Sequence, residues 1–436
     1  MPPTVEEPEL GPSLAASFDD PLLLTVAAPP GRTRYLEDEG YTLARDAEGI
    51  LAFVTDSAGD LGFGVSVDGV WYHGEPDWHR PAVIHHVSAD ALLYDFEPLE
   101  GVIVEVRLVV ATSRVAVLQV VLRETLGRRR AISLLPWLRR CGGGRYEDPM
   151  PAHGGVRMSH AVAVEFMQEV LGPGTYLEEV ADTLVAPGWE PSWVGLADCS
   201  GSVTEDFASL TGAGQTPEHR VAMLGLPIDL TLHAGAAREV TLLRGAVAMD
   251  RAPEMDGELA SAQLATPAAL LTEAAARSES LPSIEGLGGG AALVYRSSHL
   301  LLEQLMMPAE GQVAHDYYVF SREPTWWFAR LGQHTHESLA MILLAHRDPE
   351  RAMGSHRIFM ENVGINGYLP YSIGPVVMQT HLGTASSPFF SYVAWEIGKV
   401  TGDASFVADA YVAGSKIHDF WRSRRDQDGD GLAEWG

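Results

Sequence analysis

The sequence is poor in cysteine, in lysine and in long apolar runs. Only two cysteines, Cys141 and Cys199, occur among its 436 residues, and their spacing fits no metal site. We therefore expect two free thiols, as is usual in a reducing cytoplasm. No apolar run reaches the roughly 18 residues of a membrane-spanning helix. Residues 1–20 contain acids and prolines without a basic, then apolar, leader pattern. Together these features predict a cytoplasmic protein.

Positive charge is also scarce. The sequence has 30 Lys and Arg against 58 Asp and Glu, a net charge of −28, and Lys399 and Lys416 are its only lysines. So acidic a surface repels phosphate backbones and anionic lipids, which argues against nucleic-acid and membrane-surface partners. The apolar fraction of 46% and charged fraction of 20% are those of a globular protein. The length predicts two domains.

Residues 30–250 have the pattern of an antiparallel β-sandwich, preceded by an extension over 1–29. Apolar and polar residues alternate through 102–108, which places one face on a core and the other in water. Asp68-Gly69 lies between two apolar runs and predicts a tight hairpin. Further strands are expected at the following segments: 115–123, 131–137, 156–166, 220–233 and 238–247. No segment of this part shows a convincing helical period.

The second half of the sequence predicts helices. A helical linker is expected over 251–290, followed by the first part of an α/α toroid over 291–436. The expected helices of this second domain cover five segments: 291–307, 334–346, 349–363, 387–400 and 404–425. Pro349 and Pro388 suit the first turn of a helix, and Asp403 suits an N-cap.

Short and long connections alternate between these helices. Helices two and three, and helices four and five, are joined by two or three residues, whereas 308–333, 364–386 and the segment after 425 are long. In a ring of helix hairpins the long connections then gather on one face, where function usually resides. This alternation predicts an α/α toroid with a working face.

The long connections carry side chains suited to a sugar pocket, in which aromatic rings pack on sugar faces and polar groups bind hydroxyls. We expect Trp326 and Trp327 to form platforms for the sugar, although they could equally belong to the core. The polar and phenolic candidates for hydroxyl binding are Arg330, Gln333, His334, His336, Tyr368 and Tyr371.

The same residues carry a family resemblance. Residues 326–370 resemble the catalytic toroid of glycogen-debranching amylo-α-1,6-glucosidases and of glycoside hydrolase family 63, which includes mannosylglycerate hydrolases and α-glucosidases. The matching segments are Trp327-Phe328-Ala329-Arg330-Leu331-Gly332-Gln333-His334-Thr335, His336-Glu337-Ser338, Asp348-Pro349-Glu350, Gly367-Tyr368-Leu369-Pro370 and the run from Arg425 to Trp435. The resemblance implies a fold with a β-sandwich, a helical linker and a six-hairpin toroid. It also implies a glycosidase that hydrolyses an α-linked glucoside or a related small glycoside with inversion of configuration at the anomeric carbon.

Glycoside hydrolysis needs two carboxyl groups flanking the scissile bond, one of them a protonated acid. The aspartate of the debranching pattern falls on His334, whereas that of the family 63 pattern falls on Glu337. We take Glu337 as the candidate general acid and Asp316 as the second choice. The alternative is that Glu337 only stabilises the start of a helix. The resemblance places the other carboxylate beyond Gly436, so the toroid looks incomplete, and a partner chain is one source of the missing helices.

Two metal interpretations arise. A zinc site formed by His334, His336 and Glu337 is disfavoured, because helical residues two apart do not share a face. By contrast, Asp426, Asp428, Asp430 and Glu434 have the spacing of a calcium loop, with Gly431 at its turn. We expect a structural Ca²⁺ there, the alternative being a solvated acidic turn. No cofactor is required for the predicted hydrolysis.

Two other functions remain open at this point. A sugar phosphorylase of the same architecture would use phosphate in place of water and the base, although the net charge gives it no support. A non-catalytic carbohydrate-binding protein, or an inactive fragment, would fit the altered aspartate positions.

Overall fold

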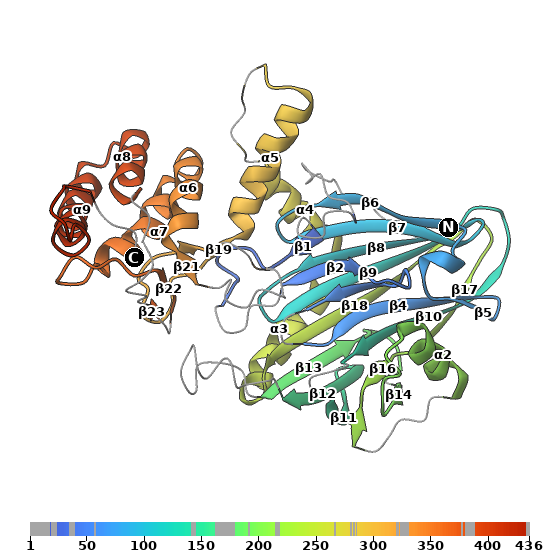
Figure 1. Ribbon diagram of the computed structural model, residues 1–436. Coiled ribbons are helices and arrows are strands. Elements are labelled where there is room, and N and C mark those ends of the chain that lie inside the picture. The colour runs from blue at the N-terminus through green and yellow to red at the C-terminus, as the bar shows by residue number, and fades with distance from the viewer. Residues whose placement is uncertain are drawn as a thin grey trace. The chain divides into compact units, whose positions relative to one another are not determined.

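The computed structural model describes 18, 24–34, 40–55, 58–140, 145–161, 179–190, 192–213, 219–265, 267–279, 281, 284, 286–319, 322, 331–375, 378–379 and 389–432 (Figure 1). The chain divides into two compact units. The first comprises residues 1–32, 36–280 and 323–325, and the second comprises 33–35, 281–322 and 326–436.

The first unit contains two antiparallel sheets, each with nine described strands. The first sheet has the order β1-β2-β3-β4-β10-β16-β14, with β5 beside β4 and β17 beside β10. Its strands are β1 (Thr25–Val26), β2 (Tyr41–Arg45), β3 (Leu51–Val54), β4 (Asp60–Val67), β5 (Val70–Tyr72), β10 (Arg130–Arg139), β14 (Val194–Leu196), β16 (Met223–Gly225) and β17 (Ile228–Leu232).

The second sheet has the order β15-β11-β12-β13-β18-β9-β8-β7-β6. Its strands are β6 (Arg80–Val87), β7 (Ala91–Leu99), β8 (Val102–Val110), β9 (Val115–Glu124), β11 (Tyr146–Ala152), β12 (Gly155–Ala161), β13 (Glu179–Val185), β15 (Arg220–Val221) and β18 (Ala237–Ala248). The predicted strands at 115–123, 131–137 and 238–247 are confirmed, as is the described part of 156–166; residues 162–166 lie outside the described residues. The predicted strand at 220–233 instead divides into β15 in the second sheet and β16 and β17 in the first.

The core of this unit lies between the sheets. Along β8, Val102, Val104, Val106 and Leu108 are all buried, as the alternation predicts. Phe53 of β3 and Tyr94 of β7 bring their rings to 6.2 Å from one sheet to the other. The predicted antiparallel sheets are thus present and packed on each other.

The Asp68-Gly69 hairpin is confirmed. Val67 of β4 pairs with Val70 of β5, and the two intervening residues have φ angles of 53° and 89°. Both values lie in the left-handed region that a two-residue hairpin of this type requires.

The expectation that this part of the chain contains no helix is wrong. Helix α2 (Val203–Ala213) packs on the first sheet, and short 3₁₀ turns occupy η2 (Glu75–Asp77) and η3 (Met249–Arg251). Phe207 of α2 lies over Gly64, where a Cβ atom would come within 2.0 Å of its ring. The absence of a side chain at Gly64 therefore leaves the space that the Phe207 ring of α2 occupies.

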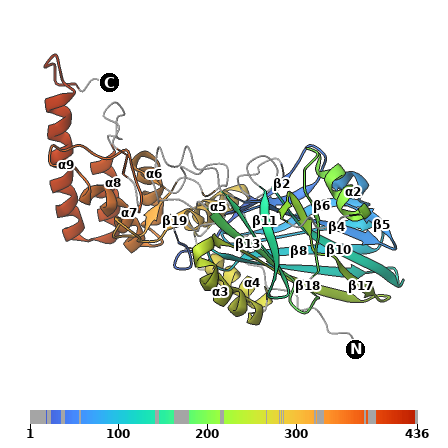
Figure 2. The same cartoon turned by 90° about the horizontal axis from the view of Figure 1, so that it is seen from below.

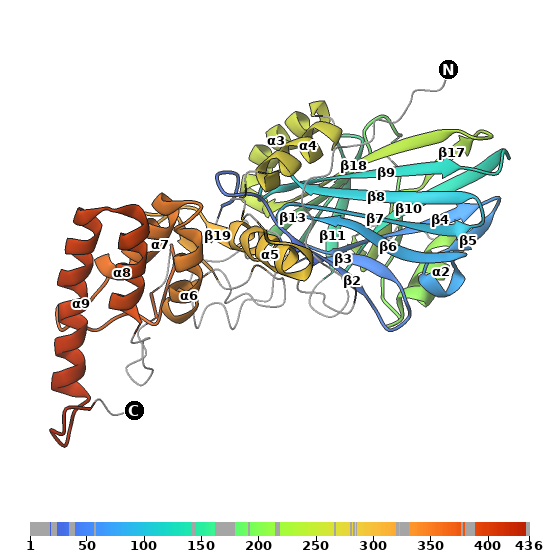
Figure 3. The ribbon, with the colours of Figure 1, turned by 90° about the horizontal axis from the view of Figure 1, so that it is seen from above.

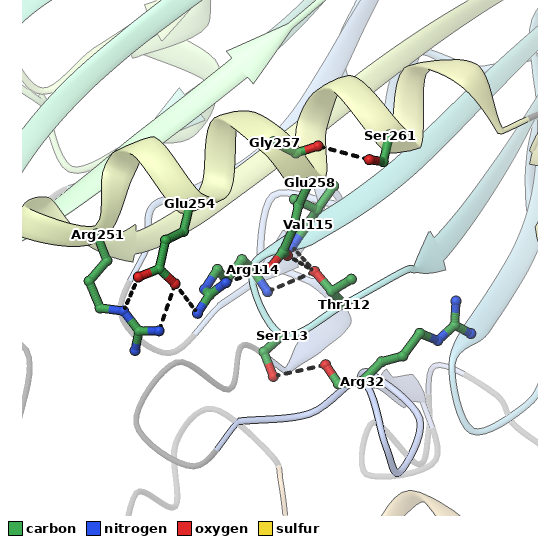
Figure 4. A network of polar contacts seen from close by, with 10 residues as sticks. All are labelled: Arg32, Thr112, Ser113, Arg114, Val115, Arg251, Glu254, Gly257, Glu258 and Ser261. Atoms are coloured by element: carbon green, nitrogen blue, oxygen red, sulfur yellow. Dashed lines mark hydrogen bonds and ion pairs between the residues drawn. The ribbon is translucent and has the colours of Figure 1, made fainter.

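Helices α3 (Ala252–Leu264) and α4 (Pro267–Glu279) lie against the second sheet (Figure 2). Met255 and Leu259 of α3 join a buried cluster with Val117 and Leu243 from the strands. At the edge of this contact the Arg114 guanidinium pairs with Glu254 at 2.9 Å and with Glu258 at 2.5 Å (Figure 4). An apolar stripe and an ion-pair network therefore fix α3 to the sheet.

The expectation of two free thiols is wrong. Cys199 is disulfide-bonded, and no described cysteine is free. Its sulfur lies 3.9 Å from the carbonyl oxygen of Arg140, the residue before Cys141. Cys141 itself lies outside the described residues. The first sheet brings these distant segments together, because β10 and β14 both pair with β16. The free-thiol argument for a reducing cytoplasm is thereby removed.

The second unit is helical. Its helices are α5 (Gly289–Gln304), α6 (His334–Leu344), α7 (Pro349–Glu361), α8 (Phe390–Thr401) and α9 (Ala404–Arg424). Its short strands are β19 (Met306–Met307), β20 (Tyr317–Tyr318), β21 (Gly332–Gln333), β22 (Ser372–Ile373) and β23 (Met378–Gln379). All five predicted helices are present with shifted ends, and α8 lies beside α9 (Figure 3).

Two of the predicted helix starts are also confirmed. Pro349 stands in the first turn of α7, and the Asp403 carboxylate caps α9 by accepting a hydrogen bond from the Phe406 amide at 2.9 Å. Pro388 lies outside the described residues. The assignment of these helices to the first part of an α/α toroid remains a prediction. None of the described helices combines the length and the apolar character that crossing a membrane requires.

Candidate active site

The helices of the second unit place the start of α6 at the end where the long connections lie. Residues 345–348 join α6 to α7, and Gly402 and Asp403 join α8 to α9. Because each pair forms a hairpin, these short connections lie at one end. The first turns of α6 and α8 lie at the other end and follow the long segments.

Three ionisable side chains meet inside this hairpin. His334 and Glu337 are three residues apart on α6 and therefore share a helix face, and His356 comes from α7. His334 is 1% exposed, and Glu337 and His356 are 0% exposed. One ligand-type atom from each lies within 4.8 Å of the others. We call these residues the His-Glu-His cluster.

Polar contacts within the cluster are few. The His356 Nδ1 atom is 3.4 Å from Glu337 Oε2, which is long for a hydrogen bond. His334 Nδ1, Glu337 Oε1 and His356 Nε2 are buried and have no hydrogen-bond partner. Each such atom costs stability, so the cluster is an energetically unfavourable arrangement for a purely structural core.

Aromatic rings form the surroundings. The His334 ring contacts Phe359 and Phe390 at centroid distances of 5.1 and 5.6 Å. The His356 ring contacts Phe390 and Phe406 at 4.6 and 6.1 Å. The Ser338 hydroxyl lies 3.4 Å from His334 Nε2. The same hydroxyl donates a hydrogen bond to the His334 carbonyl oxygen at 2.6 Å. The cluster is thus held in an apolar shell.

This environment shifts two neighbouring pKa values. Burial, with a smaller contribution from His356, lowers the pKa of His334 well below its usual range, so its imidazole is neutral. Burial, with the Glu337 carboxylate as a smaller cause, raises the pKa of Tyr318 to about 12, so its phenol stays protonated.

Glu337 therefore occupies an enclosed position. A general acid must reach the glycosidic oxygen directly or through one water. In this arrangement the carboxyl would need a local opening at the first turn of α6 before it could do so.

Asp316 lies elsewhere. Its carboxylate accepts hydrogen bonds from the Ala309 amide at 3.0 Å and from Arg351 Nε at 3.2 Å. Arg351 belongs to the first turn of α7, at the end of the hairpin opposite to the first turn of α6. The structure thus pairs Asp316 with a cation and not with Glu337.

The other described candidates are spread around the start of α6. Gln333 lies in β21 and pairs with Ser372 of β22, and the Tyr371 carbonyl accepts a hydrogen bond from the His334 amide at 3.4 Å. His336 is exposed, whereas His334 and Glu337 on the same turn are buried. Tyr368 packs edge-on against Phe420 at 5.6 Å. Trp326, Trp327, Arg330 and Glu434 lie outside the described residues.

The acidic segment after α9 forms a compact turn. Carboxylate oxygens of Asp426, Asp428 and Asp430 lie within 4.8 Å of one another. The Gly431 amide donates to Asp426 at 3.1 Å, and Gly431 has a φ of 86°. A loop that wraps a hard cation needs this sharp turn at its sixth position.

An open groove runs between α8 and α9. Its volume is about 570 Å³. Trp395 and Tyr411 in it are 58% and 76% exposed, and His418 and Asp419 lie at one end. Apolar side chains that are this exposed and line one groove are typical of ligand-binding grooves and of protein–protein interfaces.

Sequence reasoning missed His356. On α7 it lies four residues after Ala352 and three before Phe359, both of them buried, so helical spacing places it on the inward face. That spacing is the signal that could have identified it, although the sequence does not show which neighbour it faces.

Comparisons with solved structures show similarity over nearly the whole chain. A protein assigned as a kojibiose phosphorylase, from the human microbiome, aligns with 93% of this chain at a TM-score of 0.53 and 9% identity. A bacterial glucoamylase complexed with acarbose aligns with 97% of it at 0.54 and 11% identity. The chain spans 54% of the first protein and 69% of the second. Searches with the sequence find no matching family model and no similar curated protein. The chain therefore shares the fold of these two structures over the part that aligns.

Proposed function

We propose that the protein is a glycoside hydrolase that acts on an α-linked glucoside or a related small glycoside. The observation that carries this proposal is the shared fold with a glucoamylase over 97% of the chain, at a TM-score of 0.54. The working face would be the end of the second unit at which α6 begins. Hydrolysis would use two carboxyl groups and invert the anomeric carbon.

In this proposal Glu337 is the general acid. Its carboxyl group lies in an apolar shell, and it would transfer a proton to the glycosidic oxygen. Asp316 is the second candidate for a catalytic carboxyl group.

The substrate would be bound by residues around the start of α6. Trp326 and Trp327 would stack on sugar rings. The hydroxyl groups would be bound by Arg330, Gln333, His334, His336, Tyr368 and Tyr371.

Two variants test the assignment of the acid. Hydrolysis of a panel of α-glucosides and α-mannosides by the complete protein identifies a substrate, and Glu337→Gln is then compared with Asp316→Asn. We expect kcat to fall about 10²- to 10⁴-fold in Glu337→Gln with binding retained, because only proton transfer is lost. Full activity in Glu337→Gln together with loss in Asp316→Asn would transfer the role to Asp316.

A sugar phosphorylase is the second candidate function. The similarity to the kojibiose phosphorylase structure, at a TM-score of 0.53, favours phosphorolysis as much as the similarity to the glucoamylase structure favours hydrolysis. Turnover that requires inorganic phosphate and releases a sugar phosphate would establish it in place of hydrolysis. Sugar binding without turnover in either assay would instead indicate a carbohydrate-binding protein.

Two further elements belong to the proposal. The acidic turn would hold a structural Ca²⁺ through Asp426, Asp428, Asp430 and Glu434, since a hard cation prefers carboxylate oxygens.

The α8–α9 groove would be covered by helices that complete the toroid and that a partner chain can supply. Trp395 and Tyr411 would then be buried.

A further inference from the structure

The His-Glu-His cluster contains the donor set of a transition-metal site. Two imidazoles and one carboxylate, completed by a water, form a four-coordinate set that Zn²⁺ takes readily. The set of His334, His336 and Glu337, which the helical spacing disfavours, is not formed, because His336 is exposed. His356 of α7 replaces it, so the three donors come from two packed helices.

The geometry is close to that of a bound ion. Ligand atoms of a tetrahedral zinc site lie about 3.4 Å apart, given metal–ligand distances of about 2.0 to 2.2 Å. The cluster's ligand-type atoms already lie within 4.8 Å of one another. Closure by up to about 1.4 Å, which is 4.8 minus 3.4 Å, is within the reach of side-chain torsions. The helices need not move.

The unpartnered atoms give an independent indication of a ligand. His334 Nδ1, Glu337 Oε1 and His356 Nε2 are all buried and lack a hydrogen-bond partner. Buried polar atoms in native proteins are nearly always paired, and an ion that is missing from the coordinates is one explanation for exceptions.

We propose that a Zn²⁺ ion binds His334, Glu337 and His356 and that this binding switches off the catalytic acid. A carboxylate that ligates zinc has given up its proton, so it has none to transfer to a leaving group. The zinc site depends only on the cluster, whereas the inhibition rests on the proposed function.

Zinc binding to the tag-free full chain tests the site. Chelator-treated protein is titrated with Zn²⁺ against a chromophoric chelator, in excess Ca²⁺ so that the acidic turn does not compete. We expect one Zn²⁺ per chain. In His356→Gln the affinity should fall at least about 100-fold, since loss of even an outer partner of a zinc ligand costs about 10- to 100-fold. In the control His336→Ala, which changes the exposed histidine on the same turn, the affinity should be unchanged.

A second measurement avoids the risk that His356→Gln fails to fold. Co²⁺ added to the native chain should give the visible absorption of four-coordinate cobalt, and Zn²⁺ should remove it. Absence of both zinc binding and the cobalt signal in the native chain overturns the proposal. So does unchanged affinity in folded His356→Gln.

Activity is measured separately. If zinc binds and inhibits hydrolysis, both the zinc site and the inhibition are supported. If zinc binds without inhibiting hydrolysis, the proposed inhibition is overturned and the zinc site stands. Zinc binding by a chain that hydrolyses no glycoside leaves the site standing and refutes the proposed function.

Discussion

Replacement of the Glu337–His356 pair by apolar residues should stabilise the protein. The double variant Glu337→Met and His356→Leu keeps the side-chain volumes similar and removes two buried unpartnered atoms, Glu337 Oε1 and His356 Nε2. Each such atom costs about 1 to 3 kcal/mol. The contact that is lost, at 3.4 Å, is a weak one. Buried ion pairs replaced by well-packed apolar residues often give a gain of about 1 to 4 kcal/mol. We therefore expect the free energy of unfolding to rise by about 2 kcal/mol.

The single variant gives the opposite sign. His356→Leu removes the nearest polar partner of Glu337 and leaves its buried carboxyl group unsatisfied, which should cost about 1 to 3 kcal/mol. Urea denaturation followed by circular dichroism measures both changes, with chelator present so that bound metal does not contribute. The surface variant His336→Ala should lie within about 0.5 kcal/mol of the native protein. A double variant less stable than the native protein would refute the reasoning, because the pair would then contribute net stability to the hairpin.

Three other predictions concern the pH response, the sandwich and the acidic turn. Burial lowers the pKa of His86 and of His160 to about 4, with Arg140 a smaller cause for His160, whereas both titrate near 6.5 in the unfolded chain. The unfolded protein then binds more protons than the folded protein below pH 6.5, so the free energy of unfolding should fall by about 3 kcal/mol for each histidine between pH 6.5 and 4. Urea denaturation repeated across pH measures this dependence, and His86→Leu should make it less steep. The Asp182 and Arg244 side chains are both 0% exposed and form an ion pair, with Gly59 bonded to each at 3.1 and 2.8 Å. Asp182→Asn should therefore cost about 3 to 5 kcal/mol in the same assay, and a loss below 1 kcal/mol would contradict this account. Tb³⁺ luminescence should report binding at the acidic turn, with Ca²⁺ competing, and Asp428→Ala should weaken it at least about 10-fold; equal binding in that variant would place the ion elsewhere.

Local patterns predicted much of the fold. The alternation in 102–108, the Asp68-Gly69 turn and the Asp403 cap are each set by a few neighbouring residues, and each is present in the structure. Long-range packing was harder to predict. Helix α2 depends on Gly64, more than a hundred residues away, and the disulfide at Cys199 depends on strands that meet through β16.

The candidate site shows the same division. The first turn of α6 was identified from its sequence, including His334 and Glu337. His356 was missed because its partner lies on another helix and only the packing of α6 on α7 joins them. Asp316 was chosen from its sequence context, yet an ion pair with Arg351 occupies its carboxylate.

The groove on α8 and α9 also affects how the protein behaves at high concentration. Trp395 and Tyr411 expose apolar surface in this groove, which favours self-association, whereas the net charge of −28 makes the molecules repel one another. Added salt screens that repulsion, with a Debye length of about 10 Å at 0.1 M falling to about 3 Å at 1 M. The second virial coefficient measured by light scattering should therefore decrease as sodium chloride is added, and low ionic strength should be the better storage condition.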